Sequence, residues 1–588
     1  MYFKNAVLGL IFFLFAFLSV SSAATETQSS PIIDYTWPFH PEYSKNGMVV
    51  SEDSLASQIG ADILSQGGNA VDAAVAVGFS LAVTLPKAGN LAGGGFMLIH
   101  LNTGDKNIAL DYREVAPLNA SANMYLNQDG SVNNDSIRYT AKGTAVPGTV
   151  AGLVYAQQHY GRLKLSEVMK PAITIAEQGF PVSFALSQSL ESRKERLLVC
   201  ETSAKTFFKA GKKDYQPGDM MKRTDLANTL KIIAEKGNSG FYQGRIAELF
   251  VKGIKQHGGI IRLEDLKQYR PIERDVLMGN YRGYQIATMP PPSSGGVHLI
   301  EMLNILENFP LAEWGPNRSK TIQIMVEAMR SAYADRSKYL GDPAFYKVPV
   351  TGLISKLYAK KLASEITLGK ARNSNKLGPD NPIPYESPQT THFSVIDSDG
   401  NMVSNTYTLN FSYGNGHTIA GTGIVLNNEM DDFSVKPGVA NAYGLLGGEA
   451  NSIKPGKRPL SSMTPTFIFK DGKPYAATGS PGGSTIITVV LETVVNLLDF
   501  NMNIAAASSW PRFHHQWFPD VVYTEPGISA DTIENLQKMG YKIKEGRTLG
   551  STQSIVVIDH NQYGSSDPRR TGGAAIAAKS GSKTIEHK

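Results

Sequence analysis

Cysteine is almost absent from this chain of 588 residues, which contains Cys200 alone. A single thiol cannot form a disulfide within the chain, so a packed core must stabilise the fold. His514 and His515 are the residues most suggestive of a metal site, but adjacent side chains on a strand point to opposite faces. No cysteine or carboxylate cluster accompanies them in the sequence. We therefore predict that the protein uses no metal and no organic cofactor.

Concentrated charge and long apolar runs are also scarce. The formal charge is +5 with 19% charged residues and no dense Lys/Arg block, which argues against a nucleic-acid partner. Residues 1–24 combine Lys4, an apolar stretch over 6–20 and small residues at 22–24, which predicts a signal peptide. A membrane anchor is the alternative. We see no second run of about 18 apolar residues, so we expect no stable membrane span after signal removal and a periplasmic or secreted protein.

Two loops that mark common enzyme classes are missing. Gly93-Gly94-Gly95 lacks the Lys-Ser/Thr of a phosphate loop and leads into an apolar strand, which indicates a close backbone approach. The chain has no Gly-x-Ser-x-Gly elbow, which argues against an ordinary α/β serine hydrolase. It also has no internal repeat or low-complexity tract to divide it, so we expect one large unit.

The most informative segment that is present begins with a polar stretch. Residues 372–389 are rich in Asn, Pro, Gly and Ser, which predicts an exposed linker. From Thr391 onward an apolar run predicts a strand, Asp399-Gly400 predicts a hairpin turn, and Met402 to Leu409 predicts the returning strand. A two-residue turn makes paired residue numbers sum to about 799.

This register places Thr408 beside Thr390 or Thr391, at the end of the sheet. A threonine hydroxyl needs a base to become a nucleophile, and an N-terminal threonine supplies that base as its own amine. Such an amine titrates near ~8, which suits proton transfer close to neutral pH. It exists only if the Gln389–Thr390 bond is cut. We therefore predict self-cleavage that makes Thr390 the nucleophile; the alternative is that a Thr-Thr pair reflects β-propensity alone.

Further segments from about Gly47 to Arg570 carry a family resemblance. They are GGNAVDAAVAVGFSLAVT (67–84), AGNLAGGGFML (88–98), DYREVAP (111–117), TMPPPSSGGVH (288–298), AYADRSKYLGDP (332–343), QTTHFSVID (389–397), NNEMDDFS (427–434), RPLSSMTP (458–465) and TGSPGGS (478–484). In order and spacing the chain resembles the gamma-glutamyltransferases, also called gamma-glutamyl transpeptidases.

The resemblance implies an α+β fold of the N-terminal-nucleophile hydrolases, a four-layer αββα sandwich made by two chains from one precursor. It implies a large subunit over 25–389 and a small catalytic subunit over 390–588, which together form a heterodimer. One polypeptide would therefore supply both partners of the complex.

Chemistry and resemblance agree on where a γ-glutamyl group would bind. Its α-carboxylate calls for a guanidinium and hydroxyl donors, and Arg113, Ser461 and Ser462 match the family's carboxylate site. Attack on the γ-carbonyl creates an oxyanion, and the resemblance assigns its stabilisation to the backbone N–H groups of Gly482 and Gly483.

The α-ammonium calls for anionic and carbonyl acceptors. The resemblance assigns this role to Asn410, Glu429 and Asp432, although some bacterial relatives are expected to carry Gln in place of Glu429. It also implies a lid loop over 437–455 centred on Tyr443, which would exclude water from the bound group. Without this context, the alternative to the lid is an ordinary surface loop. The alternative for Asp432 is that it belongs to a solvated acidic pair.

These assignments lead to one expected reaction. Thr390 attacks the γ-carbonyl of glutathione or a related compound, and water or an amino acid or dipeptide acceptor resolves the resulting ester. Thr408 and Thr391 are expected to orient Thr390 and to assist the cleavage. Two alternatives remain open: a cephalosporin or glutaryl acylase of the same superfamily, and a secreted protein that binds γ-glutamyl compounds without turnover.

Overall fold

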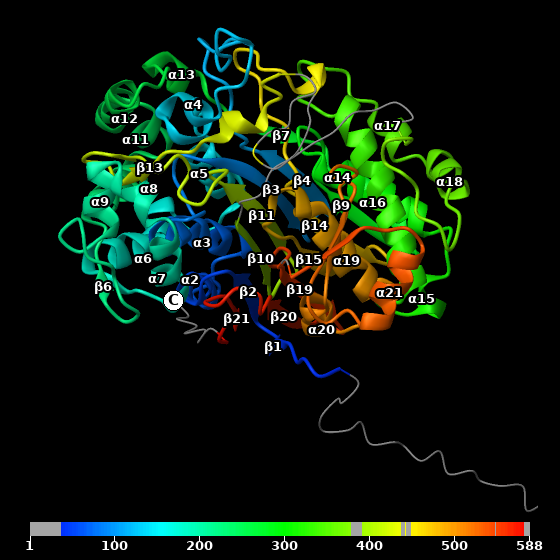
Figure 1. The fold of residues 1–588 in the computed structure, drawn as a ribbon. Helices are drawn as coiled ribbons and strands as arrows, with labels where there is room; N and C mark the ends of the chain where they lie inside the picture. Colours follow the sequence, from blue (N-terminus) through cyan, green and yellow to red (C-terminus); the bar gives the residue numbers. More distant parts are fainter. Residues whose placement is uncertain (1–36, 378–390, 437–441, 443–447, 547, 581–588) are drawn as a thin grey trace, which may run out of the picture. The chain divides into compact units, whose positions relative to one another are not determined.

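Two seven-stranded antiparallel sheets, stacked face to face, form the centre of the fold (Figure 1). The structure is a computed structural model that describes residues 37–377, 391–436, 442, 448–546 and 548–580. The first sheet has the order β21-β2-β10-β11-β3-β4-β7 and the second β1-β20-β19-β15-β14-β9-β8. Apolar side chains of both sheets, among them Met48, Phe96, Phe467 and Ile555, share one buried cluster between the layers.

The strands of the first sheet are β21 (Ala574–Ala577), β2 (Gly47–Ser51), β10 (Thr391–Asp397), β11 (Met402–Thr408), β3 (Gly94–Leu101), β4 (Lys106–Asp111) and β7 (Ile272–Arg274). Those of the second are β1 (Glu42–Ser44), β20 (Asn561–Ser566), β19 (Gln553–Ile558), β15 (Lys473–Thr478), β14 (Thr466–Lys470), β9 (Tyr284–Thr288) and β8 (Leu277–Tyr281).

Helices cover the outer face of each sheet. On the first sheet α3 (Ala70–Thr84) lies against β10 and β11, and all fifteen of its residues are buried. Its many alanines allow this close packing, and Asn69 and Asp72 form a capping box at its start. On the other side α14 (Gly295–Leu306) contacts β8 and packs on α16 (Ser319–Tyr339) and α19 (Ile486–Leu498) (Figure 1). The predicted αββα sandwich is confirmed.

The other helices of the first layer are α2 (Ser54–Ser65), α5 (Thr149–Tyr160), α6 (Leu165–Gln178), α10 (Thr224–Lys236), α11 (Asn238–Tyr242) and α12 (Gly244–Gln256). Further elements are α4 (Asn134–Tyr139), α7 (Phe184–Ser192), α8 (Lys194–Leu198), α9 (Glu201–Phe207), α13 (Leu263–Gln268), α15 (Leu311–Trp314), α17 (Val350–Leu353), α18 (Lys356–Ser364), α20 (Ile504–Ser509) and α21 (Ala530–Lys538). Short strands are β5 (Phe180–Pro181), β6 (Met220–Met221), β12 (Thr418–Ile419), β13 (Ile424–Val425), β16 (Phe513–His514), β17 (Val522–Thr524) and β18 (Ile543–Glu545).

The predicted hairpin is β10 and β11. Ile396 pairs with Met402 and Thr391 with Tyr407, so paired numbers sum to 798, one less than the two-residue turn predicts. The Asp397 carboxylate accepts hydrogen bonds from the backbone N–H groups of residues 399 and 401, at 2.9 and 3.0 Å, which lengthens the turn. The register leaves Thr408 one step beyond the last described pair of this hairpin.

The first residues of the predicted linker contact the folded part of the protein. Ser374 is 1% exposed, and its backbone N–H donates to Asp520 Oδ2 at 3.0 Å. Arg372 donates from Nε to Glu327 Oε2 at 2.6 Å. The described part of the predicted linker is therefore mixed: Ser374 is buried and bonded to the Asp520 carboxylate, whereas Asn373, Asn375 and Lys376 are exposed. The linker from residue 378 onward and the predicted signal peptide lie outside the described residues.

The adjacent histidines are satisfied by neighbouring side chains. His514 bonds Thr488 Oγ1 and Gln516 Oε1, each at 2.9 Å, and His515 Nε2 lies 3.2 Å from Asp520 Oδ1. Within the described ranges no three or more His, Cys, Asp or Glu side chains are grouped to hold a metal ion. No helix in these ranges is long and apolar enough to cross a membrane.

Candidate active site

The end of the β10–β11 hairpin is built for close backbone contact. Thr408 lies in register with Gly94 of β3, and a side chain at Gly93 would place its Cβ 1.8 Å from the Thr408 carbonyl oxygen. The glycine run 93–95 therefore exists for this approach, as predicted. Thr408 Oγ1 accepts from the Asn410 N–H at 2.8 Å, while buried Thr391 Oγ1 has no hydrogen-bond partner among the described residues. Thr390 itself lies outside them.

The imidazole nearest to this strand end is held as a neutral group. His392 is buried and bonds Thr406 Oγ1 at 2.8 Å and Ser394 Oγ at 3.1 Å. Burial lowers its pKa to about 3. Because both ring nitrogens already have hydrogen-bond partners inside the sheet, His392 is a poor candidate for a general base at this strand end.

Arg113 is the centre of a buried charge cluster. Its guanidinium contacts Glu429 and Asp432 at short distance and Glu114 Oε2 at 3.3 Å. Its remaining N–H groups donate to the backbone carbonyls of residues 459 and 460, each at 3.2 Å. All five N–H donors of an arginine are thus engaged. The structure pairs Arg113, which the sequence analysis assigned to the α-carboxylate, with two acids that it assigned to the α-ammonium.

The cluster holds more carboxyl groups than cations. Burial raises the pKa of Glu429 well above its usual range, and the charges of Glu114 and Asp432 act in the same direction. Burial also raises the pKa of Glu114, to about 7, although Arg113 opposes the shift. Burial alone would lower the pKa of Arg113, but the surrounding carboxylates raise it, so the guanidinium stays charged. Near neutral pH the cluster therefore retains a proton on its glutamates.

Asn410 joins the strand end to the charge cluster. Its backbone has φ of +70°, which asparagine tolerates better than most residues. Its side chain donates from Nδ2 to the Asn428 carbonyl at 3.0 Å, and Phe411 N–H donates to Asn428 Oδ1 at 3.0 Å. Asn428 directly precedes the 3-10 helix η2 (Glu429–Asp432), so the predicted ammonium-binding residues lie on adjoining segments.

Ser461 and Ser462 lie in the loop before β14, next to the carbonyls that Arg113 holds. Both serines are buried, each 2% exposed. The Ser461 carbonyl accepts from both the N–H and the hydroxyl of Ser294, each at 2.7 Å. Ser462 Oγ accepts from Arg336 at 3.4 Å. The predicted carboxylate-binding residues Arg113, Ser461 and Ser462 are therefore neighbours.

Gly482 and Gly483 form the turn between β15 and α19. Their φ values are +141° and +61°, and a Cβ at Gly482 would lie 2.5 Å from Thr485 Oγ1. Upstream, a Cβ at Gly479 would lie 2.4 Å from the His392 ring, so this segment passes directly beside β10. Neither the Gly482 nor the Gly483 N–H donates to an acceptor within the described ranges. These donors are suited to an oxyanion.

Some site residues were not predicted, and others are not described. Glu114 was missed, although it follows Arg113 directly inside a segment whose other residues are mostly buried. Arg336 and Ser294 were missed because the contacts that matter span 126 and 167 residues. Tyr443 and most of the predicted lid loop lie outside the described residues.

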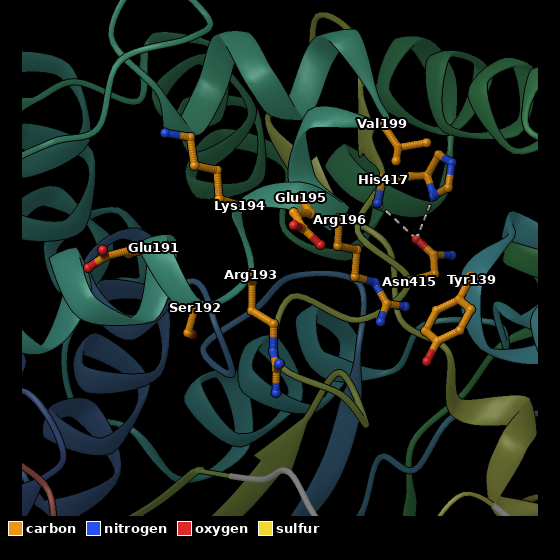
Figure 2. A pocket seen from close by; sticks show the side chains of 10 residues that line it. All are labelled: Tyr139, Glu191, Ser192, Arg193, Lys194, Glu195, Arg196, Val199, Asn415 and His417. Carbon is orange, nitrogen blue, oxygen red and sulfur yellow. Dashed lines mark hydrogen bonds between the residues drawn. The ribbon is translucent and has the colours of Figure 1, made fainter.

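A wide cavity lies elsewhere, on the helical layer (Figure 2). Its volume is about 700 Å³, and it is lined by Tyr139, Glu191, Ser192, Arg193, Lys194, Glu195, Arg196, Val199, Asn415 and His417. The Arg196 guanidinium lies 4.0 Å from the centroid of the Tyr139 ring. No predicted site residue lines this cavity, so cavity size alone does not locate the site.

Comparisons with known proteins identify the family of this chain. The sequence model of the Gamma-glutamyltranspeptidase family matches residues 56–577. A glutathione hydrolase proenzyme of Escherichia coli (strain K12) is 49% identical over 532 residues, covering 90% of this chain and 92% of that protein.

Two of the similar solved structures illustrate the likeness in fold. Cephalosporin acylase from Bacillus halodurans superposes with a TM-score of 0.81 at 28% identity, covering 93% of this chain and 99% of that one. Helicobacter pylori gamma-glutamyltranspeptidase gives a TM-score of 0.55 at 49% identity, covering 56% of this chain and 93% of that one.

Proposed function

Because this chain belongs to the gamma-glutamyltranspeptidase family, we propose that it is a glutathione hydrolase that cleaves the γ-glutamyl amide bond and passes the group to water or to amino acid or peptide acceptors. One observation carries the substrate choice. Arg113 is buried with Glu429 and Asp432 beside Ser461 and Ser462, so one site offers both a cation and acids. A γ-glutamyl head is a zwitterion that matches both charges.

The binding mode of the γ-glutamyl substrate follows from the charge balance of this cluster. The α-ammonium approaches Glu429, Asp432 and the Asn410 side chain, while the α-carboxylate takes N–H groups of Arg113 together with the serine hydroxyls. The zwitterion replaces an internal ion pair without changing the net charge of the site. Buried charges stay paired throughout, which avoids the large cost of isolating one.

The chemical step is assigned to Thr390. Its hydroxyl attacks the γ-carbonyl, its own amine takes the hydroxyl proton, and that proton passes to the leaving amine. The Gly482 and Gly483 N–H groups stabilise the oxyanion, and a γ-glutamyl ester on Thr390 remains until water or an amine resolves it. Thr391 and Thr408 orient the nucleophile.

Maturation uses the same oxygen. The Thr390 hydroxyl attacks the carbonyl of Gln389, and the peptide bond becomes an ester, which releases the Thr390 amine that later acts as base. Water then hydrolyses the ester and frees the Thr390 hydroxyl and the Gln389 carboxylate. This divides the precursor into a large subunit ending at 389 and a small subunit starting at 390. The composition of residues 1–24 supports removal of a signal peptide and a periplasmic or secreted location.

An acylase is the second candidate, because the B. halodurans neighbour is named a cephalosporin acylase. Glutaryl and γ-glutamyl groups differ by the α-ammonium alone, and the acidic residues Glu429 and Asp432 favour the group that carries it.

The substrate assignment is tested by comparing two anilides. We expect kcat/KM for γ-glutamyl anilide to exceed that for glutaryl anilide by at least about 10²-fold, since glutaryl leaves the buried acids without their cation. Asp432→Asn should narrow this ratio. Preference for the glutaryl compound would overturn the assignment, whereas no turnover of either by a cleaved protein would favour a binding protein.

A further inference from the structure

Arg336 is a buried cation that has no role in the reaction proposed above. It lies next to the serine pair Ser461 and Ser462. It lies near the end of α16 and is 0% exposed. Its Nε donates to Ser294 Oγ at 2.7 Å, and a terminal nitrogen donates to Ser462 Oγ at 3.4 Å. A fully buried arginine is rare and costly, so these contacts require an explanation.

The direction of each hydrogen bond fixes where the serine protons point. A hydroxyl has one proton to donate, and a guanidinium can only donate. Ser294 Oγ therefore accepts from Arg336 and gives its own proton to the Ser461 carbonyl. Ser462 Oγ likewise accepts from Arg336, and its proton must turn away from the positive charge.

Ser461 is oriented in the same sense. Its Oγ accepts the Met463 N–H at 3.2 Å, and its carbonyl takes both bonds from Ser294. Among the described residues neither the Ser461 nor the Ser462 hydroxyl donates to a protein acceptor. Both are thus held as donors, which suits an anion and does not suit an ammonium.

We propose that Arg336 is a positioning residue that, directly and through Ser294, presents the Ser461 and Ser462 hydroxyls as donors to the substrate α-carboxylate. This proposal rests on the proposed function and adds a residue to it. Arg336 would not touch the substrate; its charge polarises the Ser462 hydroxyl and its fork fixes the loop. A lysine has one nitrogen and cannot contact both serine oxygens with the same geometry.

The position of Arg336 also connects the carboxylate site to the oxyanion turn. One turn earlier on α16, the Tyr333 hydroxyl donates to the Ser484 carbonyl, directly after Gly482-Gly483. One rigid helix therefore holds both small-subunit loops from the side of the large subunit. Under the proposed cleavage, this contact keeps the two loops in place once the covalent link at residue 389 is lost.

The test separates binding of the carboxylate from general damage. Arg336→Lys should raise KM for γ-glutamyl anilide about tenfold and leave kcat within about twofold, because the carboxylate contact is equal in the ground and transition states. The competitive inhibition constant of L-glutamate should rise by the same factor. That of 4-aminobutanoate, which lacks only the α-carboxylate, should not change.

Two further variants guard against misfolding. Ser294→Ala keeps every charge and should show the same selective loss with a smaller magnitude. Arg330→Lys, on the same helix and 1% exposed, contacts Glu327 and Asp520 instead and should leave both inhibition constants unchanged. Equal losses for L-glutamate and 4-aminobutanoate, or a fall in kcat with KM unchanged, would overturn the role of Arg336. A wild-type protein without γ-glutamyl turnover would instead refute the proposed function.

Discussion

The two ends of the proposed site differ in the kind of chemical group that they contain. At the substrate-head end, Glu114, Glu429 and Asp432 share the single guanidinium of Arg113, and all four are buried. At the reacting end, the strand termini of β10 and β11 and the turn at 482–483 offer hydroxyls and backbone N–H groups without formal charge.

This difference separates recognition from rate. Buried charges favour a ligand that keeps them paired, so changes at the charged end should act on KM and on stability. Fixed backbone donors act where charge develops in the transition state, so changes at the neutral end should act on kcat. The predictions below either break or sharpen this division.

The largest effect is expected at the oxyanion turn. Gly482→Ala should lower kcat about 10²- to 10³-fold with KM changed by less than about threefold, because Gly482 has φ of +141° and an added Cβ moves its N–H. Steady-state kinetics with γ-glutamyl anilide measures both constants. Gly472→Ala, at φ of +73° in an open turn, is the matched control for backbone strain and should leave kcat unchanged. Equal losses in both variants would contradict the role of Gly482.

The second-largest effect is expected from removal of Arg113, the cation that the three acids share. Arg113→Met leaves three buried carboxyl groups without their partner, which should destabilise the fold by about 3–5 kcal/mol. It should also lower kcat/KM about 10²-fold, chiefly through KM. Denaturant unfolding and kinetics at several substrate concentrations measure the two effects. An unchanged KM with a reduced kcat would place Arg113 at the reacting end and break the division.

The smallest effect is expected in the pH dependence of the free energy of unfolding. Burial holds the pKa of Glu114 at about 7, above its ordinary value, so the folded state binds a proton that the unfolded chain has lost. The stability this provides is complete below the ordinary value and is lost as pH rises through about 7. It amounts to at most about 3 kcal/mol. Glu114→Gln should flatten this fall in the free energy of unfolding between about pH 5 and about pH 7.

A surface carboxylate provides the control for that slope. Glu201 pairs with Lys205 in full contact with solvent, where its side chain is 81% exposed. Glu201→Gln should leave the slope between about pH 5 and about pH 7 as it is in the wild type, since exposed pairs contribute little. A slope that responds equally to both substitutions would mean that Glu114 does not hold the proton.

The structure of the neutral end could be predicted from the sequence more readily than that of the charged end. The β10–β11 hairpin follows from local alternation and turn residues. Its paired numbers sum to 798, within one of the predicted value of about 799, because the Asp397 carboxylate lengthens the turn. The glycines at 93–95 were also read correctly, since a close backbone approach has a local signal.

The charged end depends on contacts between distant segments. The family resemblance identified Arg113, Glu429 and Asp432, but not that the arginine would pair with both acids over 316 and 319 residues. Glu114 and Arg336 carry no pattern that distinguishes a buried cation or acid from a solvated one. Only packing, which decides how many charges share one low-dielectric site, assigns them.

The central claim is that the chain makes its own nucleophile, and the intact mass of the purified wild type beside Thr390→Ala tests it most directly. The account predicts two chains in the wild type, the smaller beginning at Thr390 by N-terminal sequencing, and one uncut, inactive chain in the variant. An uncut wild type that still hydrolyses γ-glutamyl anilide would contradict it.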